Sequence, residues 1–568
     1  MLKVKHILPV SLFICATSIA AAQQNPTIKN DPATNDTILI SRSLKGVTIT
    51  GRITDAVTKK AAPGIRVQVE NFSATITDDN GHFSLSVPSY NSTVQISGEG
   101  YDQRFVPLQG KKEITVALLD ESHESIHETI NTPTGIHIKR NLTASVGTHN
   151  VNGMALPTET ADALLQGRIA GLNVIRRSGL QGAGANLFMR GYNSLYATNK
   201  PLIVVDNLLY DANEYGKSII ANNYTNPFSL IDLKDVDNIT VLRDASSIYG
   251  TKGANGAIII TTSRPRSQAT KIDFAAFTGF NQAPKELPVM NAADYRTYLS
   301  ELLQSKGLSS SEIAALPYMN DDASVATYSM YHFNTDWQKK VFQNSLANNY
   351  FLKVTGGDNI AMYGLSVGYM KNQGIINATD LSRFNMRFNA EFNFTKKFTG
   401  FANLSLTYNE QNMKDQGMAD KTAPVFLSLV KSPFLHDHDV DSKGVESPNL
   451  ADVDPLGISN PAAIINKMKA YNKYYRFMGT VGFKYKLPAY LTASTMMGVV
   501  VDKIRENIFV PSVGVAKDTL SNAIANNRMG TQVKRLFSLY NDSRLEYNRS
   551  FNQVHKFSAM AGIRFQHN

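Results

Sequence analysis

The sequence predicts a mainly β protein, in which a small β-sandwich precedes an α+β unit and then about nine antiparallel strands of an incomplete transmembrane β-barrel. Two observations support this fold class. Apolar and polar residues alternate from residue 271 onward, as they do in strands with one apolar and one wet face. The connections between these strands also alternate between long and short. Outer-membrane barrels show this asymmetry, and a soluble sandwich has no reason to keep it.

Length and composition are compatible with this architecture. The chain has 568 residues, more than one hydrophobic core usually serves, so several domains are expected. It is 43% apolar and 18% charged, which excludes bulk disorder and a bundle of membrane helices. The net charge is +10, but the basic residues are scattered singly or in pairs. We therefore expect no nucleic-acid partner.

The first residues predict export. Lys3 and Lys5 precede an apolar run over 7–19, and the alanines at 20–22 offer a small-residue cleavage site, so residues 1–22 are interpreted as a signal peptide. The alternative, a buried N-terminal helix, lacks a capping residue and an amphipathic period. Cys15 is the only cysteine and lies inside this run, so the mature chain would have no thiol chemistry. Residues 23–44 are rich in Asn, Thr, Asp and Pro and are interpreted as a flexible lead-in.

Residues 45–120 predict the β-sandwich, because short alternating segments at 47–50, 65–69 and 114–118 are separated by turn residues. Residues 121–145 are polar and irregular and are interpreted as a linker.

Residues 146–265 predict the α+β unit. A short amphipathic helix is expected over 160–169, and strands are expected over 202–206, 236–242 and 257–262. The glycines at 179–184 are not followed by Lys-Ser/Thr and do not open a helix with dinucleotide-type spacing. They are therefore interpreted as turns rather than as a phosphate-binding loop.

Residues 266–568 predict the partial barrel. The expected strands lie near 270–280, 348–356, 361–371, 384–395, 398–409, 474–486, 489–501, 533–548 and 554–566. No apolar stretch after the signal peptide reaches the roughly 18 residues of a spanning helix, so any membrane span must be a barrel. About nine strands would leave two open edges, which hydrocarbon does not tolerate, and this predicts an incomplete barrel.

These segments resemble the SusC-like (RagA-like) branch of TonB-dependent outer-membrane receptors. Residues 45–120 are similar to its carboxypeptidase-regulatory-like domain, a name that implies no peptidase activity. Residues 146–265 resemble its plug through the strings ALLQGRIAGLNV (163–174), MRG (189–191), PLIVVD (201–206), and VLRDA and IYG (241–250). The plug-motif residues are Gly167, Arg168, Gly171, Arg190, Gly191, Asp206, Arg243, Asp244, Tyr249 and Gly250.

The resemblance implies a nutrient import receptor of the outer membrane rather than an enzyme. Its implied partners are TonB with ExbB and ExbD in the periplasm, a SusD-like surface lipoprotein, outer-membrane lipid, and a nutrient such as an oligosaccharide or peptide. No cofactor is implied. Family members continue to a barrel of roughly 22 strands, so the resemblance covers only their N-terminal part. The alternative reading is a truncated, non-transporting fragment of such a receptor.

Three segments are candidate sites. Glu128, Thr129, Ile130, Asn131 and Thr132 are the best candidate for the TonB box that the family requires, and ordinary linker is the alternative. Arg243 and Asp244 could form an ion pair that loosens when the plug is pulled, or a static turn. The tract HDHD at 436–439 could contact a metal or a glycan, or form a solvated loop. No HExxH pair or cluster with structural-zinc spacing is present, so we expect no zinc enzyme.

Overall fold

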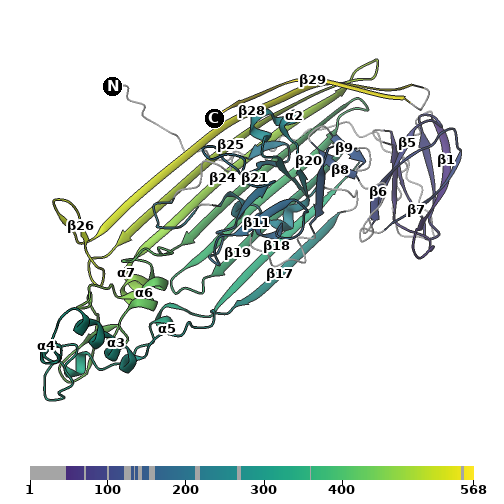
Figure 1. Cartoon of the computed structure of the whole chain (residues 1–568). Helices are drawn as coiled ribbons and strands as arrows, with labels where there is room; N and C mark the ends of the chain where they lie inside the picture. Colours follow the sequence, from purple (N-terminus) through teal and green to yellow (C-terminus); the bar gives the residue numbers. More distant parts are fainter. Residues whose placement is uncertain are drawn as a thin grey trace, which may run out of the picture.

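Figure 1 shows the computed structural model of the chain. It describes residues 46–568, with the exception of 70–71, 99–100, 120–128, 133–134, 139–141, 143, 152–159, 211–217, 225, 265–269, 359 and 552–554. The predicted signal peptide at 1–22 and the lead-in at 23–44 lie outside the described residues.

The first domain is a sandwich of two small sheets. One sheet has the order β4-β1-β7 and the other β3-β2-β5-β6. Their inward residues, such as Ile49, Val67 and Ile96, are fully buried and form one apolar core. The strands are β1 (Val47–Asp55), β2 (Arg66–Val69), β3 (Ser73–Ile76), β4 (His82–Val87), β5 (Thr93–Gly98), β6 (Tyr101–Pro107) and β7 (Glu113–Leu118). The predicted sandwich is confirmed.

The segment interpreted as an irregular linker contains a β-hairpin. Strand β8 (Thr129–Thr132) pairs with β9 (Gly135–Ile138). The isoleucine of β8, Ile130, is 1% exposed, and β8 lies against strand β15 of the next domain. The expectation of irregular structure was therefore wrong here, because one apolar side chain in a polar segment is enough to anchor a short hairpin on a neighbouring domain.

The α+β unit has a five-stranded sheet of order β10-β15-β16-β13-β14. These strands are β10 (Val146–Asn150), β13 (Leu202–Val205), β14 (Leu208–Tyr210), β15 (Val236–Leu242) and β16 (Ala257–Thr262), and a separate hairpin is formed by β11 (Leu172–Arg176) and β12 (Ala185–Met189). Short helices α1 (Ala161–Leu164), η3 (Pro227–Leu230), η4 (Leu233–Asp235), α2 (Ser246–Tyr249) and η5 (Gly250–Gly253) connect them. The helix predicted over 160–169 is shorter than expected. Gly167 adopts a φ of 71°, which a right-handed helix does not allow.

The third unit is one antiparallel sheet of nine strands in chain order, which confirms the predicted number and sequence of strands. They are β17 (Lys271–Asn281), β18 (Ser345–Gly357), β19 (Ala361–Gln373), β20 (Asp380–Asn393), β21 (Phe398–Asn412), β24 (Lys469–Lys486), β25 (Leu491–Val510), β28 (Arg528–Phe551) and β29 (His555–His567).

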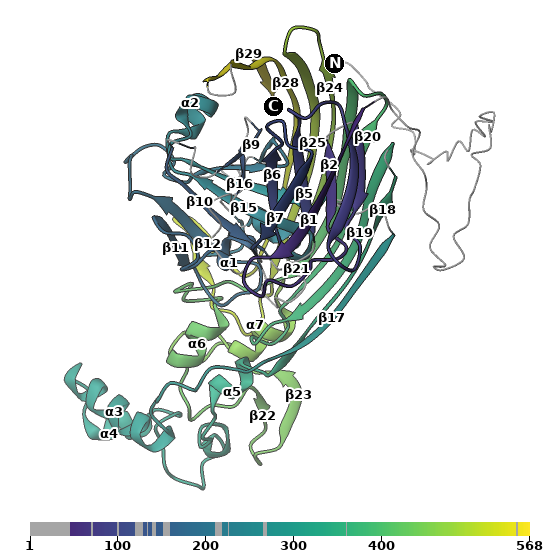
Figure 2. The same ribbon diagram turned by 90° about the vertical axis from the view of Figure 1, so that its right-hand side faces the viewer.

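The long connections gather at one end of this sheet, while the sandwich lies toward the other end (Figure 1). The first long connection carries α3 (Ala292–Ser305), α4 (Ser310–Ala315), η6 (Tyr328–Met330) and α5 (Trp337–Val341). The second carries α6 (Pro424–Val430), β22 (His438–Val440), β23 (Glu446–Leu450) and α7 (Pro461–Lys467), and the third β26 (Asp518–Thr519) and β27 (Ile524–Ala525). The α+β unit lies against one face of the curved sheet (Figure 2).

Cross-strand rows show that the other face of the sheet is apolar between two aromatic belts. Tyr369, Phe384, Tyr408 and Tyr475 are direct neighbours in one row near the loop end. Near the opposite end, Phe392, Phe394, Phe398 and Phe483 stack in succession, with ring centroids 5.1–5.7 Å apart. Exposed residues such as Leu404 and Leu406 lie between the belts. This banding matches the lipid-facing surface of a membrane β-sheet. Among the described residues, no helix has the length and apolar character of a membrane-spanning one.

Candidate functional site

The inner face of the sheet holds the α+β unit through polar side chains. Strand β20 alternates between the two faces: Arg383, Asn385, Arg387 and Asn389 point to the α+β unit and are buried or nearly so, whereas Phe384 and Met386 point away. A strand that crosses a membrane with charged residues on one face must direct them toward protein or water. The interface with the α+β unit, here called the polar seam, provides that protein partner.

Arg383 is the most buried cation of the polar seam. Its Nη2 donates to Asp232 Oδ2 at 2.8 Å, and its Nη1 donates to the Ser229 and Ile231 carbonyls at 3.0 and 3.3 Å. Both side chains of the Arg383–Asp232 pair are 2% exposed. Asp232 also accepts from the Lys234 amide at 3.0 Å and so caps η4. One guanidinium therefore fixes two consecutive 3₁₀ turns to the sheet.

A second group of contacts is centred on Arg387. Its Nη1 lies 3.2 Å from Asp206 Oδ2, and its Nε lies 3.8 Å from Asp235 Oδ2. Asp235 also accepts from Ser366 Oγ of β19 at 2.5 Å. Asp206 accepts from both the amide and the hydroxyl of Thr262, at 2.9 and 2.7 Å. Strands β13 and β16 are thereby tied to β20 through one carboxylate.

Two further contacts lie on strands β24 to β29. Arg476 forms a two-fold ion pair with Asp502, with N–O distances of 2.7 and 2.5 Å, and its guanidinium lies 3.9 Å from the centroid of the Tyr210 ring. On β29, Arg564 donates to the Ile248 carbonyl at 2.7 Å. Its guanidinium also lies 5.0 Å from the centroid of the ring of the next residue, Tyr249.

The plug-motif residues are divided between the polar seam and the body of the α+β unit. Asp206 and Tyr249 contact the sheet. Arg190, at a φ of 59°, pairs with Asp244 through two bonds of 2.7 and 3.0 Å, with side chains 56% and 52% exposed. Gly191 and Gly250 have φ values of 89° and 60° and provide turns. Arg168 is exposed just after Gly167.

The hypothesis of an Arg243–Asp244 ion pair needs correction. Arg243 donates to Ser145 Oγ at 2.8 Å and to the Ala170 carbonyl, beside Gly171, which has a φ of 77° and where an added Cβ would lie 3.0 Å from Arg243 Nε. Asp244 takes Arg190 as its partner instead. Adjacent residues direct their side chains apart here, so each fixes a different loop.

The candidate TonB box is only partly within the described residues, because Glu128 lies outside them. Thr129, Ile130, Asn131 and Thr132 form β8, whose pairing with β9 occupies one of its backbone edges. The buried Ile130 holds the segment against the α+β unit.

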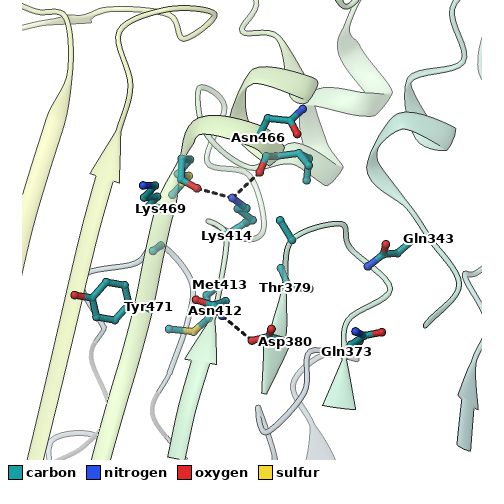
Figure 3. A pocket seen from close by; sticks show the side chains of 14 residues that line it. Gln343, Gln373, Thr379, Asp380, Asn412, Met413, Lys414, Asn466, Lys469 and Tyr471 are labelled. Carbon is teal, nitrogen blue, oxygen red and sulfur yellow. Dashed lines mark hydrogen bonds between the residues drawn. The ribbon is translucent and has the colours of Figure 1, made fainter. Parts of the chain in front are cut away.

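A pocket of about 480 Å³ lies at the loop end of the sheet (Figure 3). Gln373, Asp380, Asn412 and Tyr471 line it and form one cross-strand row. Gln411, in the adjacent row, donates to the Gln181 carbonyl of the α+β unit at 2.6 Å. Since neighbouring residues of a strand point to opposite faces, the row that lines the pocket faces away from the α+β unit. This row forms the sheet side of the pocket, and buried residues such as Met413, Lys414 and Met468 form the rest of its lining together with part of α7.

Lys414 closes one side of this pocket. It donates to the carbonyls of Ile464, Ile465 and Met468 at 3.2, 2.9 and 2.6 Å, and so caps the C-terminal end of α7. Burial lowers the pKa of Lys414 to about 8. The ammonium form therefore still predominates at neutral pH, which suits three carbonyl acceptors at a helix C-terminus.

The polar seam joins the α+β unit to the sheet through contacts that can be made and broken without covalent change. Its groups are ion pairs and hydrogen bonds between the α+β unit and the face of the sheet against which it lies (Figure 2). Water can replace such contacts one at a time, whereas an apolar interface has no substitute for its contacts. This geometry defines a class of protein in which a membrane β-sheet holds a plug domain against its polar face.

The comparisons with known proteins agree with this class. The family model of the TonB-dependent Receptor Plug Domain matches residues 139–257, and that of the CarboxypepD_reg-like domain matches residues 49–130. The TonB-dependent receptor SusC of Bacteroides thetaiotaomicron is 28% identical over 457 residues, covering 78% of this chain and 43% of SusC. The TonB-dependent receptor P26 of Formosa agariphila is 25% identical over 515 residues, covering 89% of this chain and 48% of that receptor.

Solved structures share the fold. The RagAB peptide importer in its closed-closed state superposes with a TM-score of 0.60 at 19% identity, covering 75% of this chain and 48% of the matched chain. The chain spans about half the length of the curated relatives it matches. Its plug and CarboxypepD_reg-like domains, its relatives and its structural neighbours are similar to those of SusC/RagA-like TonB-dependent receptors, which confirms the resemblance indicated by its sequence motifs.

Proposed function

We propose that the chain serves as an outer-membrane, TonB-dependent import receptor for glycans or peptides, that it acts with a SusD-like surface lipoprotein, and that it performs no catalysis. The observation that carries the proposal is the polar seam, because a plug held by replaceable polar contacts inside a lipid-facing sheet is suited to gated passage. The relatives are named TonB-dependent receptors, and one structural neighbour is named a peptide importer. Export through cleavage of residues 1–22 belongs to the same proposal.

TonB, energised by ExbB and ExbD, would take hold of the segment from Glu128 to Thr132 by adding a strand to it. In the structure β8 is paired with β9 and Ile130 is buried, so the segment must first leave the hairpin. Release of this hairpin on ligand binding would couple occupancy of the outer loops to exposure of the segment that TonB binds. This coupling requires that the ligand binds the released state more tightly.

The ligand would be held at the loop end, where the long connections lie, and the lipoprotein would cover it there. In these loops Tyr295, Tyr318 and Tyr331 are partly exposed and surround Phe434, which is buried, so only the tyrosines could offer a face to a ligand. Aromatic faces and amide groups suit both sugar rings and peptide backbones, so the structure favours neither ligand class over the other.

Uptake of labelled oligosaccharides and peptides by the native bacterium, with the gene deleted and then restored, tests the proposal. In the restored strain, Asn131→Pro removes a backbone donor from the candidate strand, and Asn131→Ala is the matched control. We expect uptake of one ligand class to fall at least about tenfold in the proline variant, with surface binding unchanged. If deletion changes no uptake, the transport proposal is wrong. If deletion abolishes uptake but Asn131→Pro does not affect it, only the position of the TonB box is wrong.

A further inference from the structure

The hairpin of β22 and β23, within the connection between β21 and β24, brings together two histidines and a glutamate. His438 Nδ1 lies 3.0 Å from Glu446 Oε1, and His436 Nε2 lies 4.0 Å from Glu446 Oε2. One potential ligand atom from each of the three residues lies within 4.8 Å of the others. The tight turn with Gly444 at a φ of 81° folds the two strands back and pairs Glu446 with Val440, two residues after His438 on the same strand face.

One atom of this cluster lacks a hydrogen bond. His438 Nδ1 is shielded from solvent and has no hydrogen-bond partner among the described residues, although it faces the Glu446 carboxylate and lies 3.4 Å from Asp437 Oδ1. Buried ring nitrogens usually have a hydrogen-bond partner. This nitrogen has none in the described part of the chain, so its lone pair is available to coordinate a metal ion.

Asp437 lies behind the cluster and is fixed by other contacts. Lys340 Nζ of α5 lies 3.0 Å from its carboxylate. Asp437 Oδ1 lies 3.5 Å from His436 Nδ1. A carboxylate behind a histidine is the arrangement that orients metal-binding imidazoles, because it accepts the proton of the nitrogen that does not bind the metal.

We propose that His436, His438 and Glu446 form a binding site for a divalent transition-metal ion of zinc type, with Asp437 orienting His436. Two imidazoles and one carboxylate are a ligand set that zinc accepts, and they leave a fourth position for water or for an external group. Binding through His436 Nε2 places the proton on Nδ1, toward Asp437. The 3.2 Å contact in which the His438 amide donates to His436 Nδ1 is then given up.

The metal would fasten the β22–β23 hairpin to the rest of the loops. The Asp437 carbonyl accepts from Asn460 Nδ2 at 2.8 Å, next to the start of α7, and the ring centroid of His436 lies 4.8 Å from that of Phe333. The cluster thus lies where three loop segments meet. An ion bound there would reduce the mobility of the hairpin that the loops present outward.

Co²⁺ provides a direct test, because its visible absorption reports a tetrahedral site with nitrogen ligands. The purified full chain in detergent is titrated with Co²⁺ and then with Zn²⁺, and bound metal is counted after dialysis. We expect one ion per chain, displacement of Co²⁺ by Zn²⁺, and slower hydrogen exchange over 436–450. His438→Ala and Glu446→Gln should each weaken binding by at least about tenfold.

Two matched variants serve as controls. Asp439→Asn changes the same HDHD tract, and His332→Ala removes a histidine elsewhere in the loops; neither residue belongs to the cluster. Both should keep the Co²⁺ spectrum. Hydrogen exchange of the plug strands must be unchanged in all variants, which separates loss of the site from loss of folding. Absence of tetrahedral absorption in the parent chain, or its persistence in the His436→Ala/His438→Ala variant, would overturn the proposal.

Discussion

Replacing Arg383 by methionine should loosen the plug more than any other single change in the polar seam. The substitution keeps much of the volume but leaves the Asp232 carboxylate buried without its cation, and the carbonyls of Ser229 and Ile231 lose their donor. Removing one partner of a buried ion pair costs about 3–5 kcal/mol. The loss should be confined to η3, η4 and strand β15, because Asp232 lies between η3 and η4 and β15 follows η4 directly.

Hydrogen exchange of the segment 227–242 measures this loss. A penalty of about 3–5 kcal/mol accelerates exchange through local opening by roughly 150- to 5,000-fold, at about 1.36 kcal/mol per factor of ten. Arg383→Met combined with Asp232→Asn should recover most of the protection, since the buried charge is removed while an oxygen remains to cap η4. Arg505→Met, an exposed arginine on β25, is the control. Unchanged exchange in Arg383→Met, or a double variant no better than the single one, would refute the reasoning.

Three further changes test other parts of the structure. Gly184→Ala places a methyl group 1.8 Å from Asn226 Nδ2, at a residue with a φ of 68°. It should lower the free energy of unfolding of the plug by about 1–3 kcal/mol in denaturant titration. Gly179→Ala, which has open space around the added methyl group, should leave that free energy unchanged. Lys414→Met removes the donor to three carbonyls and should cost about 1–3 kcal/mol of α7 protection, against little for Lys469→Met; equal effects would contradict the capping role. Leu404→Arg, midway between the aromatic belts, should reduce the free energy of unfolding in a bilayer by about 2–4 kcal/mol. Ser382→Arg, beyond the loop-end belt, should reduce it by about 0–1 kcal/mol. The reverse order would show that the belts do not mark the membrane boundaries.

The strands of the sheet could be predicted because their signal is local. Alternation over ten or more residues identifies a strand without knowledge of its partner, and the predicted number is confirmed. Their ends were less accurate. The connection expected over 372–383 shrinks to 374–379, because Gln373 and Asp380 still pair across the sheet although both are polar. Polar residues at the rim of a membrane sheet resemble loop residues in composition.

The polar seam could be anticipated only in part. Alternating polar residues in β20 indicate a wet face, but Arg383 and Asp232 are 151 positions apart and no spacing relates them. Similarly, Asp244 is next to Arg243 in sequence and pairs with Arg190, which is 54 positions away. Such pairs depend on how an inserted domain is rotated within the sheet. That rotation is set by many contacts together, so no single sequence segment predicts it.

The position of β10 at the edge of the plug sheet has a mechanical consequence. Among the described residues, β10 is the first strand of the plug in the chain, and β15 is the one strand that pairs with it in that sheet. Tension applied to the chain before Val146, along the direction of the pairing bonds, would load the Val146–Leu242 pair first and then each following pair in turn. Rupture in this unzipping geometry needs far less force than shearing all pairs at once. Strands β13, β16 and β15 would stay together, so a brief pull would free one strand and leave a template on which it could re-form.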